Sequence, residues 1–87
     1  MTKNIQSIKY NGKTIKLPFE IYPDFLDTKE VDVANHFSGE KTTLPTFAKA
    51  VRDAVLGAEL LGDYPKVRKG IDWFQKHFVK EYFVLLD

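Results

Sequence analysis

The chain has 87 residues with 13 basic and 12 acidic side chains, so its net charge at neutral pH is +1. This length predicts one small domain spanning residues 1–87, and the near-neutral charge gives no support by itself for polyanion binding. The chain contains no cysteine, which excludes a disulfide framework, a thiolate zinc site and a cysteine nucleophile and indicates a reducing, cytoplasmic setting. No apolar run is long enough to cross a bilayer, so we expect no membrane partner.

The first predicted element is a β-hairpin over residues 5–17. Asn11-Gly12 separates two β-rich runs and supplies the two positive-φ residues that a type I′ turn requires. The turn pairs Tyr10 with Lys13. Because successive side chains of a strand point to opposite faces, four apolar side chains then share one face: Ile8, Tyr10, Ile15 and Leu17. This face needs an apolar partner element, because an isolated hairpin is marginally stable in water.

Residues 19–42 allow a strand, a helix or a loop. The first four of them lie between two prolines and fit a short third strand at a sheet edge, but not a central strand. Farther on, Asp27 and Glu30 have the spacing of a capping box and favour a short helix that ends near Phe37. The alternation over residues 31–33 indicates a strand instead.

The first of two long helices is predicted to begin at Thr43 as its N-cap, with Pro45 in the first turn, and to end near Leu61, before Gly62. Apolar residues recur at three- and four-residue steps along it. This stripe predicts a buried side that consists of Leu44, Phe47, Ala48, Val51, Ala54, Val55, Ala58 and Leu61.

The second long helix is predicted to begin after Asp63, whose side chain is suited to cap it. A second apolar stripe follows the same helical period and consists of Val67, Ile71, Phe74, Phe78, Tyr82 and Leu85. The period favours one continuous helix through Glu81. The β-rich ending leaves both helix and strand open for residues 82–87.

One arc of this last helix is basic. At about 100° per residue, six side chains fall within a narrow sector: Lys66, Lys69, Trp73, Lys76, His77 and Lys80. Lysines neutralise phosphates and an exposed tryptophan stacks on bases, so the arc is a candidate nucleic-acid-binding face. The alternative is an ordinary row of solvent-facing lysines, with Trp73 packed against the hairpin and its indole N–H bonded to an acceptor.

A second candidate surface lies on the first long helix. Leu56 and Leu60 are four residues apart and lie near Lys49 and Asp53, away from the apolar stripe. Either another element covers these two leucines, or they form part of an exposed patch that meets a partner or a second copy of the chain. They are the candidate partner-binding residues.

No motif indicates catalysis, a cofactor or a metal. The five glycines are scattered, so no phosphate-binding loop is present, and no serine or threonine lies in a nucleophile elbow. His77 and Glu81 offer two ligands on one helix face, and only His36 remains as a further histidine. We therefore expect no enzyme and no evident small-molecule substrate.

These elements predict an α+β domain in which an N-terminal hairpin, with a third edge strand as an option, packs against two long antiparallel C-terminal helices. A short helix or an irregular segment connects the two parts. The expected function is a non-catalytic protein-interaction or regulatory module that binds a protein partner or itself. The alternative is a nucleic-acid-binding accessory protein.

Overall fold

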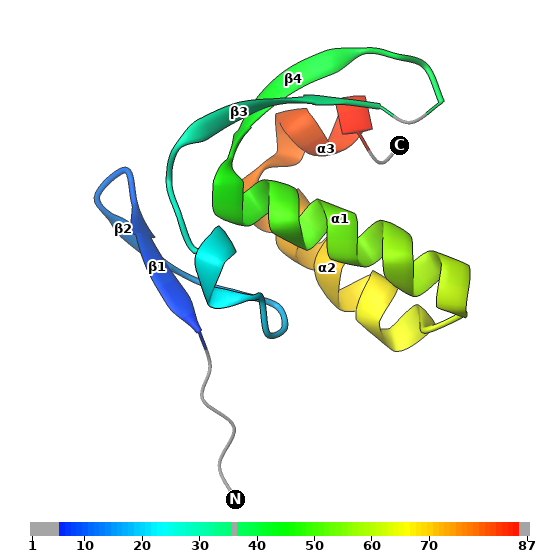
Figure 1. The fold of residues 1–87 in the computed structure, drawn as a ribbon, viewed down its shortest axis with the longest axis horizontal. Coiled ribbons are helices and arrows are strands. Elements are labelled where there is room, and N and C mark those ends of the chain that lie inside the picture. The colour runs from blue at the N-terminus through cyan, green and yellow to red at the C-terminus, as the bar shows by residue number, and fades with distance from the viewer. Residues whose placement is uncertain (1–5, 36, 86–87) are drawn as a thin grey trace, which may run out of the picture.

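The computed structural model describes residues 6–35 and 37–85, and it confirms an α+β fold. Two antiparallel strand pairs and three α-helices follow one another along the chain, with one 3₁₀ turn between the strand pairs (Figure 1). Their bounds are β1 Ser7–Tyr10, β2 Lys13–Lys16, η1 Pro23–Phe25, β3 Glu30–Ala34, β4 Lys41–Pro45, α1 Thr46–Leu61, α2 Tyr64–His77 and α3 Val79–Leu85.

The N-terminal hairpin has the predicted turn and register. Asn11 and Gly12 have φ values of 51° and 77°, and Tyr10 pairs with Lys13 while Ile8 pairs with Ile15. The apolar side chains point toward the core, whereas the side chains of the other face are exposed. The local Asn-Gly signal therefore fixes both the turn and the face that the hairpin buries.

Of the alternatives left open for residues 27–37, the strand indicated by the alternation over residues 31–33 is the one that forms, within a second strand pair, and the short helix is not formed. β3 and β4 are antiparallel, with Val31 opposite Leu44 and Val33 opposite Thr42. Asp27 does not cap a helix: its Oδ1 accepts from the N–H of Lys29 at 3.0 Å, two residues on, as in a local turn. The optional third strand over residues 19–22 is not formed, since among the described residues this stretch pairs with no strand.

Helix α1 begins two residues later than predicted. Thr43 belongs to β4, which runs directly into the helix, and Pro45 is the N-cap with extended backbone (φ −64°, ψ 152°). The carbonyl of Lys29 accepts both the N–H of Thr46, at 2.8 Å, and its Oγ1 hydroxyl, at 2.8 Å. The C-terminus is as predicted, since Gly62 adopts the left-handed conformation (φ 73°) and ends the helix.

The last helical segment is interrupted. Asp63 caps α2 as predicted, because its Oδ1 accepts from the N–H of Lys66 at 3.4 Å. The helix ends at His77, because the backbone of the C-cap residue Phe78 leaves the helical region (φ −139°, ψ 55°), and α3 then starts in a new direction (Figure 1). The prediction of one continuous helix was wrong, although the tail through Leu85 is helical; residues 86 and 87 lie outside the described residues.

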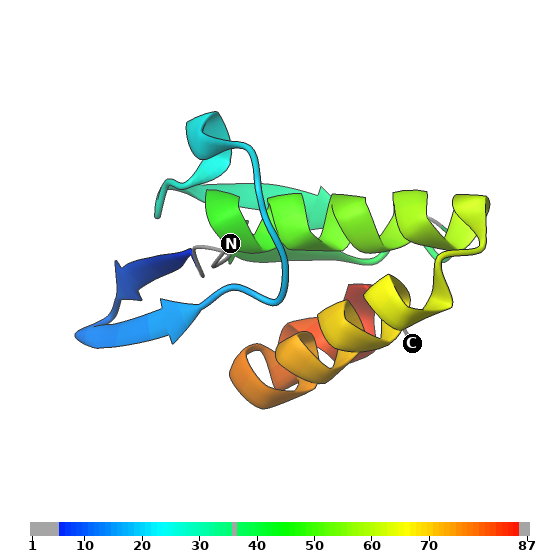
Figure 2. The same cartoon turned by 90° about the horizontal axis from the view of Figure 1, so that it is seen from below.

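One core joins the elements. Helices α1 and α2 lie side by side and antiparallel, the β1–β2 hairpin packs at one end of the pair, and β3–β4 extends along α1 toward α3 (Figures 1 and 2). An aromatic cluster lies where the hairpin meets the helices: the ring of Phe47 is 5.5 Å from that of Tyr10 and 6.1 Å from those of Trp73 and Phe78. Leu61, predicted in this core, is exposed.

Candidate functional site

The side of α1 that faces away from the core is the first candidate site among the described residues. Seven positions of this helix share one side at about 100° per residue, and we call them the outer face of α1: Thr46, Ala50, Asp53, Ala54, Gly57, Leu60 and Leu61. The buried side chains of α1 lie on the opposite side. Three of the seven residues are alanine or glycine, so the middle of the face carries no large side chain.

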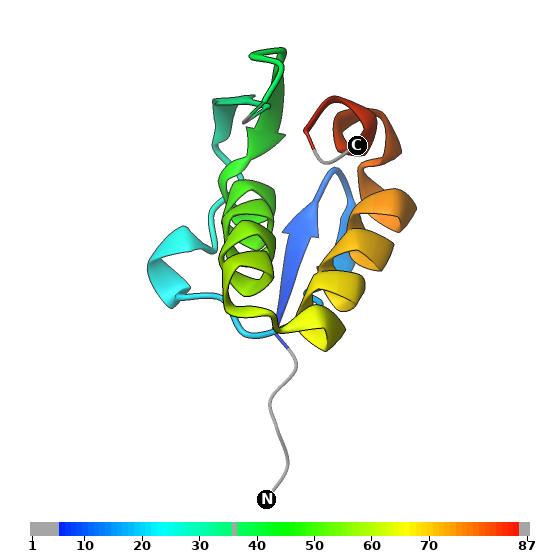
Figure 3. The same ribbon diagram turned by 90° about the vertical axis from the view of Figure 1, so that its right-hand side faces the viewer.

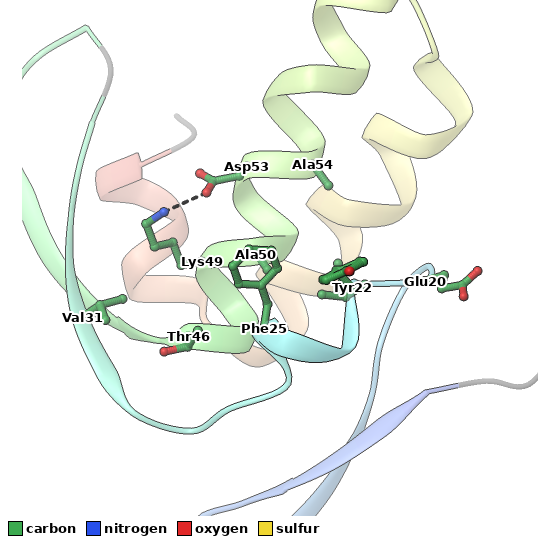
Figure 4. A pocket seen from close by; sticks show the side chains of 10 residues that line it. Glu20, Tyr22, Phe25, Val31, Thr46, Lys49, Ala50, Asp53 and Ala54 are labelled. Atoms are coloured by element: carbon green, nitrogen blue, oxygen red, sulfur yellow. Dashed lines mark hydrogen bonds and ion pairs between the residues drawn. The ribbon is translucent and has the colours of Figure 1, made fainter.

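A groove lies over the N-terminal half of this face. One wall is formed by Tyr22 and Phe25, whose rings are 6.2 Å apart and belong to η1 and the residue before it, and the other by Val31 of β3. The rings lie beside Ala50, whereas Glu20 points away from the groove (Figure 4). We call this space the α1 groove; it encloses about 350 Å³.

Two of the three charged residues that line the α1 groove, Lys49 and Asp53, form an ion pair, whereas Glu20 is in no ion pair found among the described residues. Lys49 Nζ lies 2.8 Å from Asp53 Oδ2, drawn as a dashed line in Figure 4, and Arg52 Nη1 lies 3.0 Å from Asp53 Oδ1. Arg52 also donates from Nη2 to the carbonyl of Ala34 at 2.7 Å, which ties α1 to β3. Because Asp53 is held by two cations, the groove is suited to bind an apolar group rather than to transfer protons.

Two leucines project at the other end of the outer face. Leu60 is 88% exposed and Leu61 is 87% exposed. Of the two residues predicted to contact a partner, Leu60 is therefore on the surface, whereas Leu56 is half-buried. The sequence does not predict Leu61, Tyr22 and Phe25 on this surface: the apolar stripe of the helix places Leu61 in the core, and nothing local in the sequence places the two aromatic rings beside α1.

In the basic arc of α2 and α3, the lysines are exposed or half-buried, whereas the tryptophan is buried. Lys69, Lys76 and Lys80 are exposed, and Lys66 is half-buried with its Nζ 4.9 Å from the centre of the Phe19 ring. Trp73 is only 6% exposed, and its Nε1 donates to the carbonyl of Lys16 at 2.7 Å. The indole thus packs between α2 and the hairpin, and it offers no face for stacking on a base.

Two titratable groups near the aromatic cluster have shifted pKa values. Burial, followed by the positive charges of Lys76 and Lys13, lowers the pKa of His77. Burial and the hydrogen bond to Glu30 raise the pKa of Tyr10, whose hydroxyl donates to Glu30 Oε1 at 3.2 Å. Neither side chain lines the α1 groove, so these shifts do not point to acid–base chemistry there.

Within residues 6–35 and 37–85, no three histidine or acidic side chains are placed to hold a metal ion. His36 lies outside the described residues, so its place relative to His77 and Glu81 is not defined. Over the same part of the chain, none of the helices combines the length and apolar character needed to span a bilayer.

The outer face of α1 therefore combines an apolar groove, an internally neutralised ion pair and two exposed leucines, and nothing in this geometry identifies a reaction. Comparison of the chain with protein-family models, with curated proteins and with solved structures finds no match in any of the three.

Proposed function

We propose that the protein is a non-catalytic interaction module that pairs with a second copy of itself through the outer face of α1. One observation carries the proposal: the α1 groove and the two exposed leucines lie at opposite ends of the same helix face. Because the chain lacks cysteine, we also place the module in a reducing compartment such as the cytoplasm.

A two-fold antiparallel pairing of α1 matches these two features. In such an interface each residue contact occurs twice, because the same patch of both copies takes part. Ala50 and Leu61 lie roughly 16 Å apart along the helix axis at about 1.5 Å per residue. Turning one copy end to end about a point near Ala54 therefore places Leu60 and Leu61 of each copy over the α1 groove of the other.

The middle of the face fits this arrangement. A Cβ added at Gly57 meets no atom within 4 Å, and Ala50 and Ala54 carry only methyl groups, so two backbones are able to approach closely. Lys49 and Asp53, which line the groove beside Ala50 and Ala54, are already paired with each other within each copy. Burial of the leucines removes apolar surface from water, which is the main favourable contribution to such an association.

Sedimentation equilibrium of the full chain tests the pairing. We expect wild type to form dimers as its concentration rises, and Leu60→Glu with Leu61→Lys to remain monomeric while keeping its thermal midpoint, because both leucines are exposed in the single copy. Ala54→Arg, which fills the middle of the face, is expected to prevent dimerisation in the same way.

Val79→Glu with Phe83→Lys is the matched control, since it replaces two partly exposed apolar side chains of α3 with the same charges at another surface. This variant should dimerise like wild type. A wild-type chain that stays monomeric at the highest concentration overturns the proposal, and a dimer that is weakened only by the α3 control places the interface on α3.

A further inference from the structure

A second surface forms where the hairpin meets α2. The indole N–H of Trp73 donates to the carbonyl of Lys16 at 2.7 Å, and this bond joins the outer edge of β2 to the middle of α2. Lys69 lies one turn before Trp73 and Lys76 nearly one turn after it. The hydrogen bond therefore brings a lysine of the hairpin beside lysines that are more than fifty residues away in the sequence.

Two further contacts join the hairpin and the segment that follows it to the lysines of α2. Lys13 of β2 and Lys76 of α2 both lie close enough to His77 to lower its pKa, after the larger effect of burial, and no carboxylate opposes them. At the other end of α2, Lys66 lies over the ring of Phe19 in the segment that follows the hairpin. We call the resulting surface the basic face: Lys13, Lys16, Lys66, Lys69 and Lys76.

The lysines of the basic face are not neutralised within the part of the chain that the structure describes. The two ion pairs found there both involve Asp53, on α1. Five of the twelve carboxylates lie in residues 20–32, together with one lysine, and η1, in the middle of this segment, lies on the side of α1 away from α2 (Figure 3). Asp63, Asp72 and Glu81 belong to the region of α2 and α3, but no ion pair between them and these lysines is found among the described residues.

We propose that the basic face binds the phosphate backbone of double-stranded nucleic acid without regard to sequence. Unpaired lysines on one surface neutralise successive phosphates and release counterions, which provides most of the affinity in non-specific binding. A duplex is favoured over a single strand because single-strand sites use exposed aromatic rings as stacking platforms, and Trp73 is buried while Lys66 covers Phe19.

This proposal concerns a different surface from the α1 groove, so either proposal can fail while the other holds. Fluorescence anisotropy of the full chain with a labelled 20-base-pair DNA duplex tests it. We expect binding at low salt, equal affinity for two duplexes of unrelated sequence, and a log–log salt slope of about −3 to −4 if four lysines contact phosphates.

Charge reversals separate the basic face from a general effect of net charge. Lys69→Glu with Lys76→Glu should weaken binding about tenfold or more, and Lys13→Glu with Lys16→Glu should do the same, because both elements contribute phosphate contacts. The matched control is Lys29→Glu with Lys41→Glu, which changes the net charge equally at two exposed lysines beside the ends of β3 and β4. The control should change the affinity no more than about twofold. Circular dichroism establishes that each variant remains folded.

Several outcomes overturn the proposal. They are no binding to the duplex at low salt and micromolar protein, an equal loss in the control, or tighter binding to the single strand than to the duplex. Stronger binding to phosphatidylserine vesicles than to the duplex at the same salt concentration would show instead that the basic face serves a membrane surface.

Discussion

At the scale of single residues, Gly70 is the position where the packing of α1 against α2 leaves no room for a side chain. A Cβ placed on Gly70 collides with Cγ2 of Val55 and lies 3.4 Å from the ring of Phe19. The two helices are therefore as close as this glycine allows.

We expect Gly70→Ala to lower the free energy of unfolding by about 1–3 kcal/mol, because the added methyl group overpacks a buried contact. Gly57→Ala is the control, since it also replaces a helical glycine but meets open space. It should stabilise the chain by up to about 1 kcal/mol through helix propensity. Urea unfolding measures both, and a Gly70→Ala variant that is stabilised as much as Gly57→Ala contradicts the close approach.

His77 makes stability depend on pH. Its pKa is lowered in the folded chain by burial, then by Lys76 and Lys13, so the unfolded chain binds the proton more readily. The contribution of His77 to the free energy of unfolding is therefore present in full above its ordinary pKa of about 6.5. It is lost as the pH falls from that value through the lower pKa of the folded chain. In His77→Gln, urea unfolding between pH 8 and pH 5 should show a smaller loss of stability than in wild type, and parallel curves would rule the effect out.

At the scale of elements, Asn35 joins the β3–β4 turn to α3. This side chain is 8% exposed; its Nδ2 donates to the carbonyl of Val84 at 2.6 Å, and its Oδ1 accepts from the N–H groups of Phe37 and Ser38 at 2.7 and 2.9 Å. One amide therefore satisfies backbone groups in two elements that are far apart in the sequence.

Asn35→Ala should lower the free energy of unfolding by about 1–3 kcal/mol, because three partly buried backbone groups lose their hydrogen-bond partner. Hydrogen exchange should accelerate in α3 more than in α1. In the same turn, Ser38→Ala removes only an exposed hydrogen bond to the N–H of Glu40 and should change stability by a few tenths of a kcal/mol. Equal protection of α3 in wild type and Asn35→Ala would show that the turn does not hold this helix.

The elements that the sequence predicts well are those with strong local signals. Asn11-Gly12 permits the backbone of the hairpin turn, and Gly62 and Asp63 end one helix and begin the next through their own conformation or side chain. Each of these effects acts over a few residues. Composition and spacing are therefore sufficient to predict them.

The missed elements depend on distant contacts. β3 forms because it pairs with β4 across a loop, whereas the local capping pattern at Asp27 only makes a turn. Phe78 is neither glycine nor proline, and its ring packs near those of Tyr10, Phe47 and Trp73, a cluster that the periodicity of one helix does not reveal. The continuous helix was wrong for that reason.

The residues of the candidate surfaces also divide into those that the local sequence identifies and those that only distant contacts place. Leu60 is identifiable because it lies off the apolar stripe of its own helix, but the wall of Tyr22 and Phe25 exists only after η1 folds over α1. Trp73 lies between the apolar stripe and the lysines of α2, and the docking of β2 determines that it is buried. The hairpin lysines of the basic face depend on the same contact.

At the scale of the whole molecule, charge and apolar surface are distributed over different sides. The basic face spans the hairpin and α2, whereas the α1 groove lies between α1, η1 and β3. In Figure 3, η1 and α2 lie on opposite sides of α1. A dimer formed through α1 would keep both basic faces accessible. The two proposed activities are therefore compatible in one assembly.

The position of Trp73 also has an optical consequence. It is the single tryptophan of the chain, and its indole lies at the joint between the hairpin and α2, within 5.1 Å to 5.5 Å of the rings of Phe74, His77 and Phe78. Its fluorescence emission therefore reports whether the hairpin is docked, while the far-ultraviolet dichroism of the same sample reports the helices. The chain thus carries a built-in probe that distinguishes detachment of its N-terminal hairpin from unfolding of the helical pair.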